Sequence, residues 1–264
     1  LETPEDIQVL RDNNIGVALM GETFMRSPNK VEKLAYLYGP TYYTPKVKMC
    51  GISKVKTIPA VVEAKPDYMG LVFAPSKRQV TVDQAKILVE ELHRGYAKKY
   101  GSDTEYDKND TIKTVGVFVN ETVDNLVAIA NEVNLDAVQL HGDEDEAFIQ
   151  ALKEKIDVEV WKAVQIRSAA DAEAWIDSSA DMLLFDAYHK DERGGTGEVF
   201  DWSCLDEFER PFMLAGGIDS TNVARAIRTV RPYGIDISSG IETDGVKDDE
   251  KIKAFTNIVR TIAH

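Results

Sequence analysis

Short apolar segments alternate with longer amphipathic segments along most of the chain, from residue 46 onward. The apolar segments are rich in Val, Ile, Leu and Phe, which is typical of strands buried on both faces. Eight of them occur, at residues 47–50, 68–73, 115–119, 137–140, 160–164, 182–185, 212–215 and 234–237. The amphipathic segments predict helices at residues 82–92, 122–132, 144–154, 169–176 and 221–228. Thr81 and Ser168 stand at the N-cap positions of two of these helices.

Strict alternation of strand and helix predicts a parallel sheet, because parallel strands need a crossover between them. Eight such units suit a closed barrel. We therefore predict an α/β fold, a (β/α)8 TIM barrel, for residues 46–264. Residues 94–111 interrupt the rhythm and are rich in Lys, Asp, Gly and Tyr. Here we predict a solvated extension of the preceding helix and a surface loop, because charged runs usually face solvent.

The first 45 residues do not belong to the repeat. Their pattern predicts a helix at residues 4–13, a strand at residues 16–21 and a second helix at residues 31–37, which together form an N-terminal αβα appendage. A lone strand of buried type cannot satisfy its own edges. This segment is therefore either the remnant of a larger domain or a piece that docks on another surface.

Charge narrows the range of partners. The chain has 31 Lys and Arg residues against 45 Asp and Glu residues, a formal charge of −14, which disfavours binding to nucleic acid or anionic lipid. It contains no apolar run of about 18 residues and begins with acidic residues rather than a secretory signal. Its two cysteines, Cys50 and Cys204, lack metal-site spacing. We expect a cytoplasmic protein without a membrane span or a metal.

Two glycine turns follow the seventh and eighth predicted strands, where barrels of this type commonly hold phosphate. Gly216 and Gly217 lie in the first turn, and Ser239 and Gly240 lie in the second. Both turns can present backbone N–H groups to an anion. Either turn alone could simply allow a tight connection, but the pair favours a phosphate site and hence a small phosphorylated ligand.

Polar residues follow or end the other strands. They are Cys50, Arg78, His141, Lys162, Asp186 and Asp236. Each residue type also has a structural role, since a free cysteine is often buried and an arginine is usually solvated. The side chain of Lys162 either points outward beneath a helix or pairs with a carboxylate inside the barrel. A thiol, a guanidinium, an imidazole and carboxylates at one rim are nevertheless costly to bury without a function.

Several ordered motifs resemble the phosphoribosylanthranilate isomerase family. They are VKMCGI at 47–52, GLVFAPSKR at 70–78, VGVFVN at 115–120, DAVQLHGD at 136–143, FDA at 185–187, GGTG at 194–197, FDW at 200–202, LAGG at 214–217 and DISSGIE at 236–242. The resemblance covers residues 46–264. It implies an Amadori rearrangement in tryptophan biosynthesis, in which N-(5-phosphoribosyl)anthranilate becomes 1-(2-carboxyphenylamino)-1-deoxyribulose 5-phosphate without a cofactor.

The same resemblance implies residue roles. Cys50 matches the general base that removes the C2 proton, and Asp186 matches the general acid that protonates the furanose oxygen. Arg78 would meet the anthranilate carboxylate, and His141 and Asp236 would line the pocket. A general base needs a depressed thiol pKa, whereas a general acid must hold its proton near neutral pH.

A second resemblance concerns residues 1–45. Residues 3–7 and 16–26 are similar to the C-terminal end of indole-3-glycerol-phosphate synthase, a barrel that is sometimes fused in front of the isomerase. The chain would then be the isomerase part of a bifunctional enzyme, with the missing synthase domain or a second copy in a homodimer as its partner. Most of the synthase barrel is absent, so we do not expect synthase activity. We expect this segment to pack as a helical appendage and to be dispensable for catalysis.

Two alternatives stay open. The histidine-pathway isomerase that acts on a phosphoribosyl-formimino substrate resembles this fold and does the same chemistry, but its family has an aspartate where Cys50 stands. The cysteine favours the anthranilate substrate, while dual specificity remains an alternative. The other alternative is a non-catalytic scaffold that binds a sugar phosphate. The presence of both Cys50 and Asp186 argues against this one.

Overall fold

A computed structural model describes residues 44–101, 111–187 and 201–262, together with Thr3, Asp6, Ile7, Val9, Leu10, Gly21 and Arg26. The chain divides into two compact units, Leu1–Thr44 with Ala263–His264, and Pro45–Ile262. In the first unit Asp6, Ile7, Val9 and Leu10 are helical, within the helix predicted at residues 4–13. Gly21 is helical too, so the predicted strand does not reach this glycine, a residue type that strands disfavour. The rest of the predicted appendage lies outside the described residues.

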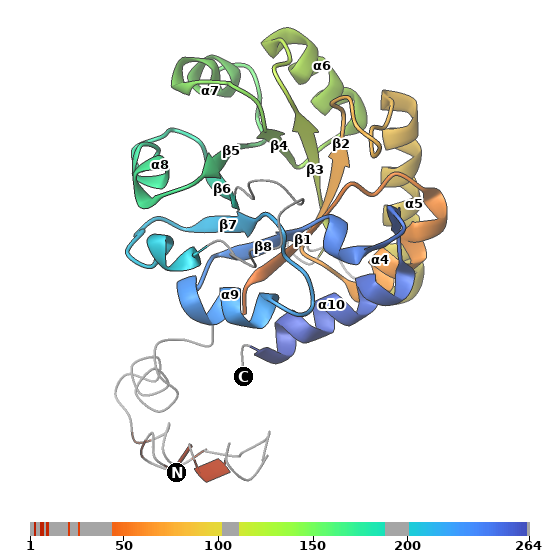
Figure 1. Cartoon of the computed structure of the whole chain (residues 1–264). Helices are drawn as coiled ribbons and strands as arrows, with labels where there is room; N and C mark the ends of the chain where they lie inside the picture. Colours follow the sequence, from red (N-terminus) through yellow and green to blue (C-terminus); the bar gives the residue numbers. More distant parts are fainter. Residues whose placement is uncertain are drawn as a thin grey trace. The chain divides into compact units, whose positions relative to one another are not determined.

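The second unit is a closed barrel of eight parallel strands, as predicted (Figure 1). The strands are β1 (Lys46–Cys50), β2 (Tyr68–Val72), β3 (Lys113–Phe118), β4 (Ala137–Leu140), β5 (Glu159–Ile166), β6 (Met182–Ala187), β7 (Phe212–Ala215) and β8 (Gly234–Ile237). Each strand pairs with the next one in the sequence, and β1 closes the barrel on β8. This order follows from crossovers that return each strand beside its predecessor.

Helices surround the barrel (Figure 1). They are α4 (Ile58–Ala64), α5 (Val82–Tyr100), α6 (Val123–Val133), α7 (Glu146–Lys153), α8 (Ala169–Glu173), α9 (Val223–Val230) and α10 (Asp249–Ile262). Short 3-10 turns occur at η1 (Val55–Thr57), η3 (Trp202–Leu205) and η4 (Ser239–Ile241), and β9 (Glu242–Thr243) forms a hairpin with β10 (Val246–Lys247). Among the described residues, no helix is long and apolar enough to cross a membrane.

The predicted helices are confirmed, with shifted ends. Thr81 caps α5 through a capping box with Gln84, as its position suggested. Helix α5 extends to Tyr100, so the first part of the predicted extension is helical; residues 102–110 lie outside the described residues. This extension is not fully solvated, because Tyr96 is buried and the hydroxyl of Tyr100 donates a hydrogen bond to the carbonyl oxygen of Val62.

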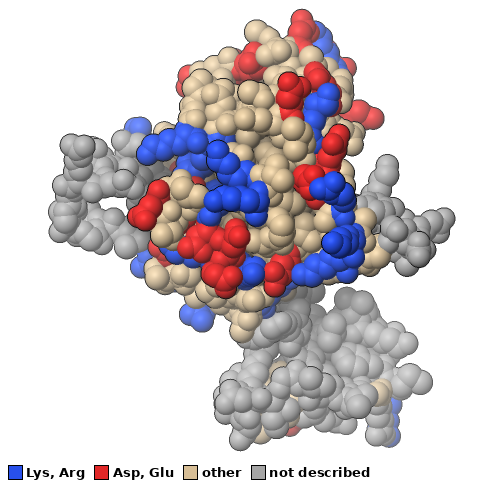
Figure 2. All heavy atoms as spheres, turned by 90° about the vertical axis from the view of Figure 1, so that its right-hand side faces the viewer, with Lys and Arg blue, Asp and Glu red and all other residues tan. Residues whose placement is uncertain are grey.

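The surface carries many paired charges. Lys86 pairs with Glu132 across α5 and α6, and Lys253 pairs with Glu63 across α10 and α4. Figure 2 shows basic and acidic side chains interspersed over the face of the molecule that it presents. Exposed pairs of this kind contribute little to stability. Burial of apolar side chains, both inside the barrel and on the outer face of its strands, is therefore the main source of stability.

Side chains that point into the barrel form one buried cluster, made of Tyr68, Val115, Ala137, Trp161, Ala163, Leu184, Met213 and Ala215. Residues opposite each other on paired strands share a face. Lys48 lies opposite Tyr68 and Asp236, and Asp186 lies opposite Ala215, so these charged residues also face the interior. Strand geometry thus brings ionisable groups into the bore and to its rim.

Candidate active site

A cavity of about 410 Å³ opens at the carboxyl ends of the strands. Of the sequence-predicted site residues, those that line it are Cys50, Arg78, His141, Asp186, Gly216, Gly217, Asp236 and Ser239. Gly240 is not in the lining, but it lets two loops meet, because a Cβ there would collide with the carbonyl oxygen of Ile218. The structure therefore gathers these predicted residues, which come from six of the eight strand ends, around one cavity.

The two glycine turns form one side of this cavity. Gly216 and Gly217 have φ values of +87° and +61°, which glycine adopts at little cost. Gly240 belongs to η4, and its close approach to Ile218 sets the turn after β8 against the turn after β7. Neighbouring backbone turns of this kind can hold an anion through their N–H groups.

Cys50 lies above a buried ion pair. Lys48 precedes it by two residues on β1 and faces the same side, and the Nζ atom of Lys48 is 3.0 Å from Oδ2 of Asp236. The Lys48 side chain has no exposed surface, and Asp236 is 8% exposed. Oδ1 of Asp236 has no hydrogen-bond partner within the described part of the chain. A polar ligand in the cavity could satisfy this oxygen.

Burial raises the pKa of the Cys50 thiol. The ammonium groups of Lys48 and Lys247 oppose this rise, whereas the Asp236 carboxylate adds to it. The direction is opposite to the depression that the sequence argument required. The physical reason is that removing the thiol from water penalises the thiolate more than the two cations stabilise it. Burial also acts on Lys48, but Asp236 and Cys50 outweigh it and raise the pKa of Lys48.

His141 and Asp186 face each other at the mouth. Nε2 of His141 is 3.4 Å from Oδ2 of Asp186, and both side chains are about one-third exposed. On the other side of the ring, Nε2 of Gln139 lies 2.8 Å from Nδ1 of His141. Because an amide nitrogen only donates, this contact fits the imidazole tautomer that accepts at Nδ1 and carries its N–H on Nε2. His141 thus presents an N–H group to Asp186.

Arg78 is held by a carboxylate that the sequence analysis did not single out. Its Nε and Nη2 atoms donate to Oε1 and Oε2 of Glu242 at 2.6 and 2.9 Å. Lys247 also donates to Oε1 of Glu242, at 2.9 Å. Burial opposes ionisation of Glu242, but the hydrogen bonds from Arg78 and Lys247 outweigh it and lower the pKa of Glu242 to about 2. Glu242 is therefore ionised near neutral pH.

Lys162 points outward, as in the first alternative from the sequence, and pairs with a carboxylate, as in the second. Its neighbour Trp161 faces the barrel interior, so Lys162 points to the outside of the sheet. There it pairs with a carboxylate, at 3.1 Å from Oε2 of Glu144, and donates to the carbonyl oxygen of Gly142 at 2.7 Å. Both ion-paired side chains are almost fully buried. Lys162 therefore supports the loop after β4 from below and does not line the cavity.

Four residues near the site were missed by sequence reasoning. Lys48 and Gln139 lie two residues before Cys50 and His141, so the period of a strand could have found them. Glu242 and Lys247 belong to the β9–β10 hairpin. No sequence pattern shows that this hairpin folds back onto the loop after β2.

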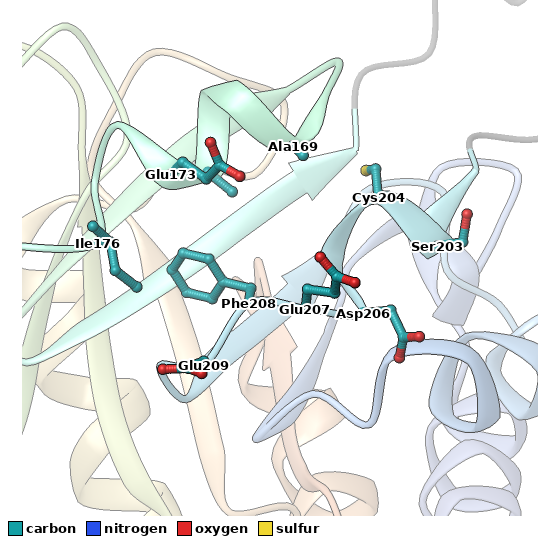
Figure 3. Close-up of a pocket in the computed structure, with 10 residues that line it drawn as sticks. Ala169, Glu173, Ile176, Ser203, Cys204, Asp206, Glu207, Phe208 and Glu209 are labelled. Carbon is teal, nitrogen blue, oxygen red and sulfur yellow. The ribbon is translucent and has the colours of Figure 1, made fainter.

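Another pocket, of about 500 Å³, lies between α8 and η3 (Figure 3). The ring of Phe208 stands at its centre, with the carboxylates of Glu173 and Glu207 nearby. Cys204 lines it too, and burial raises the pKa of this thiol. Across the described ranges, no group of three or more His, Cys, Asp or Glu side chains could hold a metal ion. None of the residues predicted for the active site lies in this pocket.

These features define an enzyme class: a (β/α)8 barrel with a thiol, a carboxyl group and glycine turns around one cavity at the carboxyl ends of its strands. A family model described as N-(5'phosphoribosyl)anthranilate (PRA) isomerase matches residues 47–258. The chain belongs to this family.

Relatives and solved structures agree. The chain is 45% identical over 219 residues to N-(5'-phosphoribosyl)anthranilate isomerase from Thermoanaerobacter sp. (strain X514), covering 82% of this chain and 98% of that one. It is 42% identical to the isomerase from Endomicrobium trichonymphae, covering 83% and 100%. The phosphoribosyl anthranilate isomerase structure from Thermotoga maritima has a TM-score of 0.69 and 33% identity, covering 82% and 99%.

Proposed function

We propose that this protein converts N-(5-phosphoribosyl)anthranilate into 1-(2-carboxyphenylamino)-1-deoxyribulose 5-phosphate, a step of tryptophan biosynthesis. The observation that carries the proposal is the shared cavity of Cys50, Arg78 and Asp186, beside the two glycine turns. A related isomerase has been solved in complex with the reduced form of this product. That structure is 31% identical in sequence to this chain and has a TM-score of 0.66. A ligand of that kind has a carboxylate, a phosphate and a ribose-derived chain, and the cavity offers a partner for each.

Asp186 acts as the general acid. It gives its proton to the furanose oxygen as the C1–O bond breaks, and the nitrogen lone pair forms a C=N bond, which leaves an open-chain iminium ion. Cys50 acts as the general base and removes the C2 proton, so that the C–H electron pair forms a C1=C2 bond and the iminium electrons return to nitrogen. The resulting enol becomes the ketone when its O–H proton is lost and C1 gains one. Protons balance within these steps, so the reaction requires no cofactor.

The remaining site residues bind and orient. The guanidinium of Arg78 suits the planar anthranilate carboxylate. Gly216, Gly217, Ser239 and Gly240 would present the phosphate site. The unpartnered Oδ1 of Asp236 can accept from a hydroxyl group of the substrate.

His141 and Lys48 would support the acid and the base. The Nε2–H of His141 can hold Asp186 in place as it changes its protonation state. The Lys48 ammonium stabilises the Cys50 thiolate against burial. Both effects act on the group that transfers the proton.

Residues 1–45 have a separate proposed origin. We propose that they are the end of an indole-3-glycerol-phosphate synthase barrel, as from a bifunctional enzyme, and that catalysis does not need them. The family model begins at residue 47, which supports this division. A dimeric relative is known from Thermotoga maritima, which makes a second copy of the chain a natural partner alongside a synthase domain. Biosynthesis of an amino acid would place the protein in the cytoplasm.

The test of function is turnover by the purified protein. Freshly formed N-(5-phosphoribosyl)anthranilate should lose its anthranilate-type fluorescence when the protein is added, and mass spectrometry should find an isomer of unchanged mass that borohydride reduces. The histidine-pathway phosphoribosyl-formimino substrate, supplied in parallel, should turn over far more slowly. Turnover of that substrate alone, or binding without turnover of either, would overturn the proposal.

A further inference from the structure

The guanidinium of Arg78 can bind a carboxylate along either of two edges, and Glu242 binds one of them. A guanidinium has five N–H donors in a rigid plane. Nε and one N–H of Nη2 donate to the carboxylate of Glu242. This contact takes the side edge of the fork. Among the described residues, no hydrogen-bond partner takes the end edge, formed by Nη1 and the second N–H of Nη2, and Arg78 lines the cavity that contains Cys50.

Arg78, Glu242 and Lys247 form a charged cluster beside the cavity. Glu242 and Lys247 already contact other groups of the protein. Nζ of Lys247 forms an ion pair with Glu242, 2.9 Å from Oε1, and donates hydrogen bonds to the carbonyl oxygen of Ser238 at 2.8 Å and to its Oγ at 3.4 Å. Oε1 of Glu242 accepts from both Arg78 and Lys247. Within the described part of the chain, Nη1 of Arg78 has no hydrogen-bond partner, so Arg78 can bind a further carboxylate.

The charges of the cluster also fit an anionic ligand. Arg78 and Lys247 are cations and Glu242 is an anion, so the cluster has one net positive charge. One carboxylate from a ligand would neutralise it. Lys247 and Glu242 are less than one-tenth exposed, so this balance acts in a site that water screens weakly.

Without Glu242 the position of Arg78 would be poorly fixed. Arg78 lies in the loop after β2, its side chain is 33% exposed, and a long flexible side chain has many rotamers to lose when it binds. Its stem crosses Gly51, where a Cβ would collide with Cδ of Arg78. Glu242 thus fixes the position of the Arg78 guanidinium, and close packing on Gly51 fixes the position of its aliphatic stem.

We propose that Glu242 is a positioning residue that orients Arg78 for end-on, bidentate recognition of the substrate's aryl carboxylate, and that it thereby determines specificity for carboxylated aryl amines. The proposal rests on the proposed function, because it assumes that an anthranilate-type ligand enters this cavity. If so, Glu242 affects binding of the aryl carboxylate alone, and it does so through Arg78.

The test compares two ligands on two variants. The ligands are reduced 1-(2-carboxyphenylamino)-1-deoxyribulose 5-phosphate and the same compound with a phenyl group in place of carboxyphenyl. Glu242→Gln should weaken calorimetric binding of the carboxylated ligand about tenfold and change binding of the phenyl ligand by less than about twofold. In an Arg78→Met background, Glu242→Gln should have no further effect on either ligand.

Controls separate the outcomes. Glu132→Gln removes a carboxylate from the exposed pair with Lys86 and should leave both affinities unchanged. Glu242→Asp keeps the charge but withdraws it by one methylene, and it serves if Glu242→Gln fails to fold; it should show the same selective loss. Equal losses for both ligands would overturn the positioning role. If wild type bound neither ligand, the proposed function would fail first.

Discussion

Lys48 and Asp236 form an ion pair inside the barrel, with Nζ 3.0 Å from Oδ2, on strands that otherwise bury apolar side chains. A buried charge pair is costly to desolvate, and an apolar pair of similar volume would often be as stable. The pair lies below Cys50, where the ammonium opposes the effect of burial on the pKa of the thiol and Asp236 raises the pKa of the ammonium.

Lys48→Met should shift the pH dependence of kcat/KM to higher pH. Burial already raises the pKa of Cys50, so the thiolate gains population as pH rises through that pKa, and loss of Lys48 raises the pKa further. At pH 7 we expect a loss of about tenfold or more, with partial recovery in alkaline buffer, since one pKa unit changes the thiolate fraction tenfold. Lys86→Met, at an exposed pair, is the matched control. An unchanged midpoint in Lys48→Met would contradict this role.

Lys162→Met tests support of the site from outside the barrel. It would leave Glu144 buried and unpaired, although Glu144 would still accept from the backbone N–H groups of Asn120 and Gly142. We expect the free energy of unfolding to fall by about 3–5 kcal/mol in urea titrations, as for other broken buried pairs. A loss below about 1 kcal/mol, the value for exposed pairs, would show that the pair does not hold the loop.

Gly51→Ala should affect ligand affinity as well as stability. Gly51 has a φ of +78°, and a Cβ would meet the side chain of Arg78. We expect weaker binding of the carboxylated ligand in addition to a strain cost of about 1 kcal/mol. Gly101→Ala is the matched comparison, since Gly101 has a φ of +92° but its added methyl group would meet no described atom within 4 Å. If both substitutions left affinity unchanged, the close packing of Arg78 on Gly51 would not matter for binding.

Much of the fold could be predicted from the sequence, because each βα unit has its own local pattern. Eight apolar segments of strand length and intervening amphipathic segments define the barrel, and barrel geometry then places Cys50, Asp186 and Asp236 at one end. The contribution of Glu242 could not be predicted. It depends on a hairpin folding back across the barrel mouth, a tertiary contact between residues separated by 164 positions.

The direction of the Cys50 pKa shift was also beyond the sequence. The role of general base suggested a depressed thiol pKa. The direction of the pKa shift depends on whether burial of the thiol outweighs the attraction of Lys48 and Lys247 for the thiolate. These quantities exist only in the folded structure. The pH profile of the reaction is therefore informative in a way that the motif is not.

The most direct test of the acid/base pair is the rate of fluorescence loss with freshly formed N-(5-phosphoribosyl)anthranilate in wild type, Cys50→Ala, Asp186→Asn and the control Glu132→Gln. We predict that wild type and the control turn over alike, and that each site variant retains its fold and loses about 10²–10⁴-fold in kcat. Near-normal turnover in folded Cys50→Ala or Asp186→Asn would contradict the assignment of this acid/base pair.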